Sequence, residues 1–359
     1  MNILFIAGES HPELLGGIET FGRNLKKYFG KDLKFIANIP KRKRFYKVED
    51  IIEIKELNII EKVLNKILKN KLKKRTLEKI IDILKPDYLI LNRPNEVNLL
   101  KNIKVPKILV QHINYDIYLT AKNYFNNNLK YSEKILQEID CFVFLSEFDK
   151  EKFIKELNFP KEKAITIRHS CKVAGIKEIK NRNKKLLMIA RLDNKQKRFD
   201  LAILSMKNLK GFTLDIYGSG KDENYILELI KNNNLANVKL HRGITNVEEI
   251  LDEYGIFIMT SDYEGYGITN IEAMRRGLPI ILRDTFEAAK DVVVANQNGI
   301  LLDKEWSEEK FIKSIYKIYN NYEYYSKNAI LLGKRYDEKI IEKEWKALLK
   351  KIDKKSRNL

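Results

Sequence analysis

Short apolar runs recur along the chain, and segments with helical spacing separate most of them. The first series of runs spans 2–7, 34–39, 87–92, 107–112, 141–146 and 164–169, and the second spans 185–191, 212–218, 238–243, 255–261 and 278–283. Continuous apolar strands are typical of parallel sheets that are covered on both faces. Helical patterns between them, as at 18–29 and 147–157, favour βα units. Two such series predict an α/β protein with two doubly wound, Rossmann-like domains.

A polar and basic stretch divides the two series. It reads "KVAGIKEIKNRNKK" and contains few large apolar side chains. With 359 residues the chain is long enough for two domains. We therefore predict an N-terminal domain over 1–171, a linker over 172–184 and a C-terminal domain over 185–325. A helical segment over 326–359 is expected to pack back on the N-terminal domain.

The net charge of +19 suits an anionic partner, such as a nucleotide, a nucleic acid or a membrane surface. No run of eighteen apolar residues is present, and the start "MNILFIAG" resembles a first strand more than a signal peptide. Cys141 and Cys171 are expected to be buried thiols in a reducing compartment. These features favour a cytoplasmic protein.

The carboxyl ends of parallel strands are where open α/β sheets bind ligands. Gly16 and Gly17 precede a helix after the first run, where backbone amides can approach an anion. His112 and His169 each follow a strand; we favour a ligand-binding role for His112 and a structural role for His169. A nicotinamide or flavin site is disfavoured because the glycine fingerprint and its acidic partner are missing.

The second series carries cations and glycines at its strand ends. Arg191 ends the strand 185–191, and Lys197 follows in a polar loop, an arrangement that suits a diphosphate. Gly218 and Gly243 end two further strands and are candidates for close backbone approach to a ligand.

The stretch "EGYGITNIEA" is the most informative in the chain. Gly265, Tyr266 and Gly267 form a loop before a helix, and the amides of Ile268, Thr269 and Asn270 are expected to point toward a phosphate. Glu272 lies little more than one turn into that helix, from where it can accept hydrogen bonds from ribose hydroxyls. Glu264, in the loop, is placed to meet the next part of such a ligand.

These residues carry a family resemblance. "EGYGITNIEAMRRGLPII" resembles the E-x7-E signature of retaining glycosyltransferases of the GT-B architecture, glycosyltransferase family four. The segments "GGIETF", "VQHINYD", "LSEFDKEKF", "ARLDNKQKRFDLAI" and "NGILL" are similar to further parts of that family, so the resemblance covers most of the chain. It implies two Rossmann-like domains facing across a cleft, the first on the acceptor side and the second binding the donor.

The resemblance also implies roles for individual residues. Arg191 and Lys197 would neutralise the donor diphosphate, and Glu272 would bind the ribose. Glu264 and His112 would contact the transferred sugar, and the Gly16–Gly17 loop would approach donor phosphate or acceptor. Three departures are visible: "TIRHSCKV" replaces a common Asn-Gly, Arg191 follows Ala190 rather than Gly, and Lys197 lies one residue later than usual.

Expulsion of a nucleoside diphosphate requires positive charge at the leaving group. The chain has no Asp-x-Asp motif, so we expect no divalent metal or other cofactor, with the two cations and the helix dipole in their place. The expected donor is a UDP-sugar, with GDP-mannose second. Front-face attack and a covalent intermediate both remain open as routes to retention.

The acceptor is less constrained. Basic runs at 41–47 and 62–75, the second with helical apolar spacing, favour an anionic membrane surface. We therefore expect a cell-surface polysaccharide, lipopolysaccharide or lipid-linked glycan as acceptor, reached from the inner membrane face. The alternatives are a nucleotide-sugar epimerase or a phosphorylase of the same architecture, the latter disfavoured by chain length. A basic nucleic-acid-binding protein would not explain glycine-framed glutamates, and the oligomeric state stays open.

Overall fold

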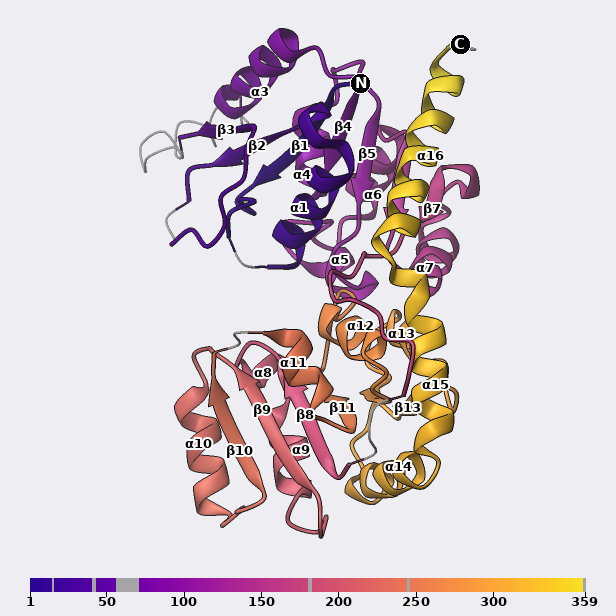
Figure 1. Ribbon diagram of the computed structural model, residues 1–359. Coiled ribbons are helices and arrows are strands. Elements are labelled where there is room, and N and C mark those ends of the chain that lie inside the picture. The colour runs from indigo at the N-terminus through magenta and orange to yellow at the C-terminus, as the bar shows by residue number, and fades with distance from the viewer. Residues whose placement is uncertain (15, 41–42, 56–70, 180–182, 244–245, 358–359) are drawn as a thin grey trace. The chain divides into compact units, whose positions relative to one another are not determined.

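The structure is a computed structural model that describes residues 1–359 except 15, 41–42, 56–70, 180–182, 244–245 and 358–359 (Figure 1). The chain forms two compact units: unit 1 comprises Met1–Arg168 and Glu342–Leu359, and unit 2 comprises His169–Ile341. The chain therefore passes between the units twice, after Arg168 and after Ile341.

Unit 1 contains a parallel sheet in the order β3-β2-β1-β4-β5-β6-β7. The central strand β1 pairs on one side with β2, Ile3 opposite Leu33, and on the other with β4, Ile3 opposite Tyr88. The strands are β1 (Ile3–Gly8), β2 (Leu33–Asn38), β3 (Ile51–Ile54), β4 (Tyr88–Leu91), β5 (Lys107–Val110), β6 (Cys141–Phe144) and β7 (Ala164–Thr166).

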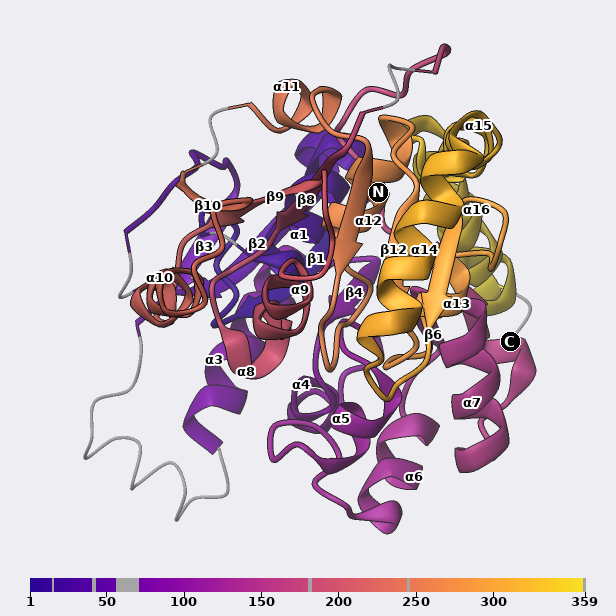
Figure 2. The same ribbon diagram turned by 90° about the horizontal axis from the view of Figure 1, so that it is seen from below.

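Helices lie on both faces of this sheet (Figures 1 and 2). Phe5 of β1 contacts Phe21 on one face, and Phe21 contacts Trp345 of the last helix, with ring centroids 6.0 and 5.7 Å apart. Leu4 and Ile6 belong to the core of the other face. The helices are α1 (Gly17–Phe29), α3 (Lys71–Leu84), α4 (Pro94–Leu99), α5 (Tyr115–Thr120), α6 (Leu129–Gln137), α7 (Glu147–Leu157) and most of α16 (Glu338–Arg357).

Unit 2 contains a second parallel sheet in the order β10-β9-β8-β11-β12-β13. Its strands are β8 (Lys185–Ile189), β9 (Thr213–Gly218), β10 (Val238–Arg242), β11 (Ile256–Met259), β12 (Ile280–Arg283) and β13 (Gly299–Leu302). Its helices are α8 (Asn194–Lys197), α9 (Phe199–Ser205), α10 (Glu223–Asn232), α11 (Val247–Asp252), α12 (Ile268–Arg275), α13 (Ala289–Val292), α14 (Glu308–Asn320) and α15 (Tyr322–Gly333), followed by the 3-10 turn η3 (Lys334–Tyr336).

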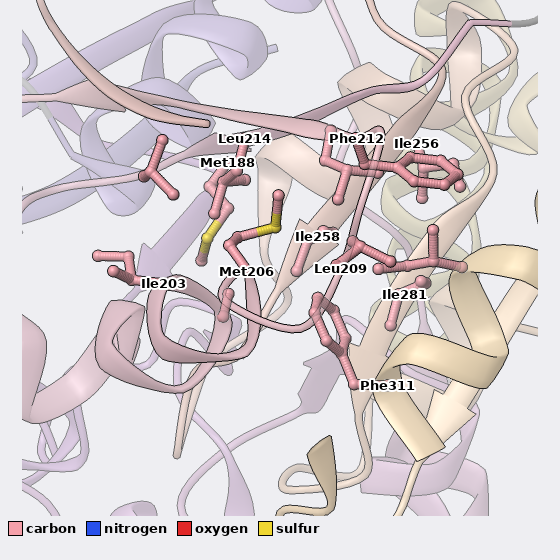
Figure 3. Close-up of a cluster of buried hydrophobic side chains, with 14 of the residues drawn as sticks. Met188, Ile203, Met206, Leu209, Phe212, Leu214, Ile256, Ile258, Ile281 and Phe311 are labelled. Atoms are coloured by element: carbon pink, nitrogen blue, oxygen red, sulfur yellow. The ribbon is translucent and has the colours of Figure 1, made fainter. Parts of the chain in front are cut away.

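One face of the unit 2 sheet forms a large apolar core (Figure 3). Alternate residues of the strands, such as Ile256 and Ile258 of β11, point into it. Phe311 of α14 and Ile203 of α9 cover them from outside the sheet. The α12 helix contacts β11 and β12, so the segment between β11 and α12 is anchored in a rigid framework.

The predicted fold class is confirmed: both sheets are parallel and helices alternate with the strands. The edge strand β3 was missed because it is only four residues long and has no fully buried residue. Cys141 and Cys171 are free and buried, as predicted. Among the described residues, no helix combines the length and the apolar character needed to span a bilayer. The basic run at 62–75 falls mostly outside the described residues, as do 41 and 42 of the first run.

Candidate active site

The loop between β11 and α12 depends on a glycine with left-handed backbone. Gly267 has φ of 75° and immediately precedes α12. A Cβ atom at this position would lie 2.5 Å from Nδ2 of Asn270. Both the conformation and the space therefore require glycine, and Gly267 fixes the direction in which the helix begins.

The N-terminus of α12 offers backbone donors. The N–H of Asn270 donates to the carbonyl of Gly267 at 3.0 Å, so it is already used. The amides of Ile268 and Thr269 are first-turn groups for which helix geometry supplies no acceptor. Of the three predicted phosphate-binding amides, these two are therefore the candidates for binding an anion, which the helix dipole favours there.

Glu264 and Lys197 form a buried ion pair. The Glu264 carboxylate binds Nζ of Lys197 through Oε1, and the same oxygen accepts a hydrogen bond from Ser261 Oγ at 2.7 Å. The two side chains are 10% and 13% exposed, so little water screens their charges. Sequence reasoning assigned both to the donor site, and the structure brings them together.

Arg191 is connected to the same loop through the side chain of Gln196. Its guanidinium is exposed and donates to Gln196 Oε1 at 3.0 Å. Gln196 in turn donates from Nε2 to the backbone carbonyl of Tyr263 at 3.1 Å. Arg191 thus keeps most of its donors available while one of them orients the loop that carries Glu264.

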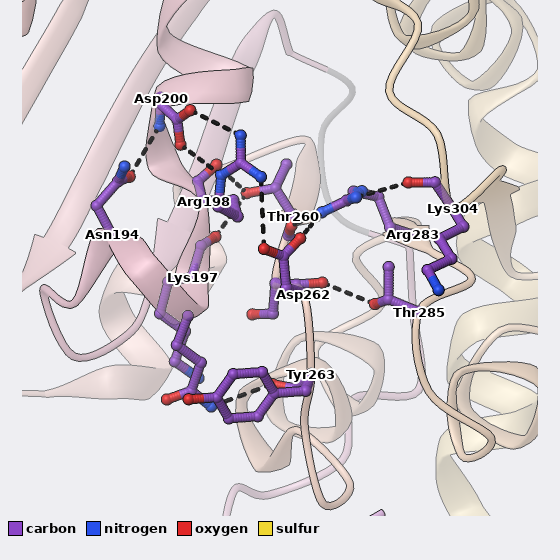
Figure 4. Close-up of polar contacts among 12 residues, drawn as sticks. Asn194, Lys197, Arg198, Asp200, Thr260, Asp262, Tyr263, Arg283, Thr285 and Lys304 are labelled. Carbon is purple, nitrogen blue, oxygen red and sulfur yellow. Dashed lines mark hydrogen bonds and ion pairs between the residues drawn. The ribbon is translucent and has the colours of Figure 1, made fainter. Parts of the chain in front are cut away.

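A second polar network joins the loops after β8 and β11 (Figure 4). Thr260 Oγ1 donates to the backbone carbonyls of Lys197 and Arg198 at 2.9 and 2.8 Å. Asp262 accepts hydrogen bonds from Arg283 at 2.6 Å and from Arg198 at 3.4 Å. Arg283 is buried and also donates to the carbonyl of Thr260 at 2.8 Å. These contacts hold Lys197 and Glu264 on one frame.

The sequence analysis did not identify this polar network. Arg198, Thr260, Asp262 and Arg283 stand beside predicted residues or at strand ends, but nothing in their spacing distinguishes them from solvated polar residues. Arg198 has a left-handed φ of 50°, a conformation that is uncommon for arginine and that the sequence therefore does not predict.

Glu272 retains some exposed surface, but dense surroundings remove water from its carboxyl. This desolvation raises its pKa to about 7, partly opposed by the charge of Lys172. The carboxyl therefore changes protonation state near neutral pH. The ionised form is the one that accepts hydrogen bonds from vicinal hydroxyls.

The other predicted glycines of unit 2 have different surroundings. A Cβ atom on Gly218 would lie 2.0 Å from the carbonyl oxygen of Ala190, so this glycine permits close packing of the loops after β8 and β9. Gly265 is partly exposed in the loop before α12. Gly243 has φ of 77°, and no described atom lies within 4 Å of its Cβ position. Residues 244 and 245, which follow it, lie outside the described residues.

Tyr266 is buried. Its hydroxyl donates to Asp291 Oδ2 at 2.7 Å and lies 2.9 Å from the hydroxyl of Tyr336. His169 packs against its ring with centroids 6.2 Å apart, and burial lowers the pKa of this histidine to about 4. Within the described residues Tyr266 is therefore placed as a structural anchor of the loop, and His169 is a neutral packing residue.

Three predicted residues lie in unit 1. Gly16 and Gly17 are exposed at the start of α1. His112 follows β5, where its Nε2 atom lies 2.7 Å from Asn92 Oδ1 and its ring contacts Phe21 with centroids 5.0 Å apart. These contacts fix the imidazole orientation.

The sequence and the fold both resemble those of known proteins. Residues 173–330 match the family model for glycosyl transferases group 1. An uncharacterized glycosyltransferase of Haemophilus influenzae is 27% identical, with 93% of this chain and 96% of the relative aligned. A poly(ribitol-phosphate) alpha-N-acetylglucosaminyltransferase of Staphylococcus aureus is 26% identical over 74% of this chain and 54% of its own length.

A solved structure extends the likeness to the whole fold. The crystal structure of Anabaena Alr3699/HepE in complex with UDP superposes with a TM-score of 0.78 and 15% identity, covering 98% of this chain and 100% of that one. The architecture is therefore GT-B. It spans about half the length of several curated relatives that it matches.

Proposed function

Because residues 173–330 match glycosyl transferases group 1, we propose that the protein transfers a hexose or N-acetylhexosamine from a UDP-sugar to a cell-surface glycan. We further propose that the transfer retains the anomeric configuration and needs no metal ion. The observation that carries the proposal is the buried Lys197–Glu264 pair at the start of α12. The pair supplies a cation and a carboxylate, and Glu264 lies in the loop that leads into α12, whose first-turn amides suit a phosphate.

The donor would bind along α12. The amides of Ile268 and Thr269 would receive one phosphate, and Arg191 and Lys197 would neutralise the diphosphate. Glu272 would accept hydrogen bonds from the ribose hydroxyls. Lys197 has three N–H donors, so it can contact a phosphate oxygen while it still holds Glu264. A UDP complex of a structurally similar protein supports uridine as the nucleoside.

In the transfer, the bond between C1 of the sugar and the β-phosphate oxygen breaks, and UDP leaves with the electron pair. The acceptor hydroxyl oxygen bonds to C1, and its proton goes to the departing phosphate. Positive charge from Arg191, Lys197 and the α12 dipole stabilises the leaving group, which is the contribution that a divalent metal would otherwise make. Glu264 would orient the sugar, and His112 of unit 1 is proposed to contact it as well.

Retention has support from one relative. The Staphylococcus aureus relative is named for an alpha linkage. Common UDP-hexoses also carry the sugar in the alpha configuration, so an alpha product would mean retention. The same relative's phosphate-containing polymer and the net charge of +19 support an anionic glycan acceptor, and lipopolysaccharide or lipid-linked glycans share that chemistry.

The test is a product assay with UDP-glucose, UDP-galactose and UDP-N-acetylglucosamine, with anionic and neutral glycan acceptors, each with and without EDTA. We expect UDP release that depends on acceptor, an alpha anomeric signal by NMR, and no effect of EDTA. Conversion of the donor without acceptor would instead indicate an epimerase. A beta product, or loss of activity with EDTA that Mg²⁺ restores, would contradict retention or metal independence respectively.

The proposed site of action is the inner membrane face. The two basic runs, at 41–47 and 62–75, support this location by composition alone. Sedimentation with vesicles of anionic or neutral phospholipid tests it, because binding should require anionic lipid and weaken at high salt. Equal recovery with both vesicles would refute membrane association.

A further inference from the structure

We propose that Tyr266 and Arg275 are positioning residues that tie the two ends of α12 to the segments joining the units, so that nucleotide-sugar binding on α12 alters those segments. This inference rests on the proposed donor site. The first joining segment is 169–176, where the chain enters unit 2, and the second is 333–341, where it leaves.

The two joining segments contact each other. The N–H of Cys171 donates to the carbonyl of Tyr336 at 2.9 Å. Cys171 and Asp337 also form an isolated parallel β-bridge. About 165 positions separate the two joining segments in sequence. Backbone hydrogen bonding inside unit 2 nevertheless connects them.

Tyr266 ties the N-terminal end of α12 to this pair of segments. It is 2% exposed, and its hydroxyl bridges Asp291 and Tyr336, of which Tyr336 belongs to the second joining segment. Arg335, also in that segment, donates to the backbone carbonyl of Asp291. The ring of His169, in the first segment, contacts Tyr266 from another side.

Arg275 ties the C-terminal end of α12 to the same two segments. Its Nε donates to the carbonyl of Val173 at 2.7 Å, in the first segment. Its Nη1 and Nη2 donate to the carbonyl of Gly333 and to Asp337 Oδ2, each at 3.3 Å, in the second. The carbonyl of Arg275 accepts from the N–H of Ile176 at 3.1 Å.

The two ties act on one short rigid body. The α12 helix has eight residues, so it moves as a unit. Tyr266 and Arg275 are themselves buried, and buried hydrogen-bonded networks have discrete arrangements and do not deform continuously. A phosphate that binds the amides of Ile268 and Thr269 would displace the N-terminal end of α12. Tyr266 and Arg275 would transmit this displacement to both joining segments.

Hydrogen–deuterium exchange of the full chain with and without UDP tests the coupling. In the wild type we expect UDP to slow exchange both in the loop 264–270 and in the two joining segments. In Tyr266→Phe, saturating UDP should still protect the loop, while protection of the joining segments falls by roughly three-fold or more, as for loss of one buried hydrogen bond. Tyr254→Phe is the matched control, because its hydroxyl bonds Tyr217 elsewhere in unit 2.

Arg275→Gln removes three contacts and can unfold the protein, so Asp337→Asn provides a milder test of the second tie. Its carboxylate is 43% exposed and should be replaced without loss of the fold. We expect weaker protection of the joining segments and a lower kcat with an unchanged KM for the donor. A merely structural role would lower the melting temperature and leave the UDP-dependent difference intact.

The outcomes separate the two proposals. Protection of the loop by UDP without any change in the wild-type joining segments would overturn the coupling and leave the donor site standing. Equal protection in Tyr266→Phe and the wild type would overturn the role of Tyr266. If UDP protects no peptide of the wild type, the proposed donor site fails and the coupling falls with it.

Discussion

Lys197 and Glu264 lie 67 positions apart in the chain and form a buried ion pair where α12 begins. The lysine ends α8, and the glutamate lies in the loop after β11. In a site with little water each charge is stabilised by the other, and the pair holds a carboxylate in the loop that leads into α12, whose first-turn amides favour an anion. The donor site that we propose is built around this relationship.

Glu264→Gln and Lys197→Met should each lower kcat, because one removes the group that orients the sugar and the other removes charge at the leaving diphosphate. We expect a loss of roughly 10²- to 10³-fold for each. Each should also destabilise the protein by about 3 kcal/mol, since it leaves one buried ion unpaired, whereas the double variant should lose less than the sum. Steady-state kinetics and denaturant unfolding measure both effects.

The control for this pair is Lys310→Met, which removes the exposed ion pair with Asp303. It should leave activity and melting temperature unchanged, because water screens exposed pairs. Additive losses in the double variant would show that Lys197 and Glu264 do not act as a pair.

Glu272 should make the stability of the protein fall as pH rises from about 4.5 to about 7, whereas His169, whose pKa burial lowers to about 4, should act in the opposite sense. Burial raises the pKa of this carboxyl to about 7, so the folded state binds a proton that the unfolded state has already released in this range. The effect is at most about 3 kcal/mol, reduced by the exposure that the carboxyl retains. Urea unfolding at several pH values should show that the stability of the wild type relative to Glu272→Gln falls across this range, and a constant difference would contradict the assignment.

Donor affinity should rise over the same pH range, because ribose hydroxyls bind the ionised carboxylate. The measurement requires an intact UDP-sugar, in which both phosphates are esterified and neither titrates near neutrality. We expect tighter binding by calorimetry at about pH 8 than at about pH 6, and little difference in Glu272→Gln. Weaker binding at the higher pH would contradict the proposed ribose contact.

Gly267→Ala should destabilise the protein more than Gly211→Ala. The two glycines have φ of 75° and 77°, so the backbone strain of about 1–2 kcal/mol is shared. Only at Gly267 would the new Cβ approach another group closely, Nδ2 of Asn270 at 2.5 Å; at Gly211 its nearest neighbour, Lys184 Nζ, lies 3.8 Å away. Thermal unfolding compares them, and UDP binding should be lost only in Gly267→Ala.

Arg283→Met should reduce activity although this residue touches no part of the proposed ligand. It removes hydrogen bonds to the carbonyls of Thr260 and Lys304 and to Asp262, which then retains its longer contact with Arg198. We expect a loss of stability of about 2–4 kcal/mol and a fall in kcat, because the loop that carries Glu264 is no longer held. Unaltered kinetics in the folded variant would show that the loop does not need this support.

Most of the fold could be predicted because parallel strands that are buried on both faces form uninterrupted apolar runs. The runs at 87–92 and 255–261 correspond to β4 and β11, whose residues are all buried. The edge strand β3 lacks that pattern, since it lies at the margin of the sheet. Its four residues could not be distinguished from a loop.

The site was predictable only where chemistry and spacing coincide locally. Gly267 and Glu272 fall within a few residues of each other, so their roles follow from one loop and one helix. The contacts of Tyr266 with Asp291 and Tyr336 span 25 and 70 positions and depend on tertiary packing. Nothing in the sequence distinguishes Arg275 from a solvated arginine, and only the fold shows that it reaches Val173 and Gly333.

The most direct test of the account is binding of a UDP-sugar panel by thermal shift in the presence of EDTA, with Glu272→Ala and Lys197→Met beside the wild type. A ligand that binds the folded state raises the melting temperature by mass action. We predict that one UDP-sugar stabilises the wild type equally with and without EDTA, and that both variants lose this shift. If no UDP-sugar shifts the wild type, or if both variants retain the full shift, α12 is not the donor site and the central claim is wrong.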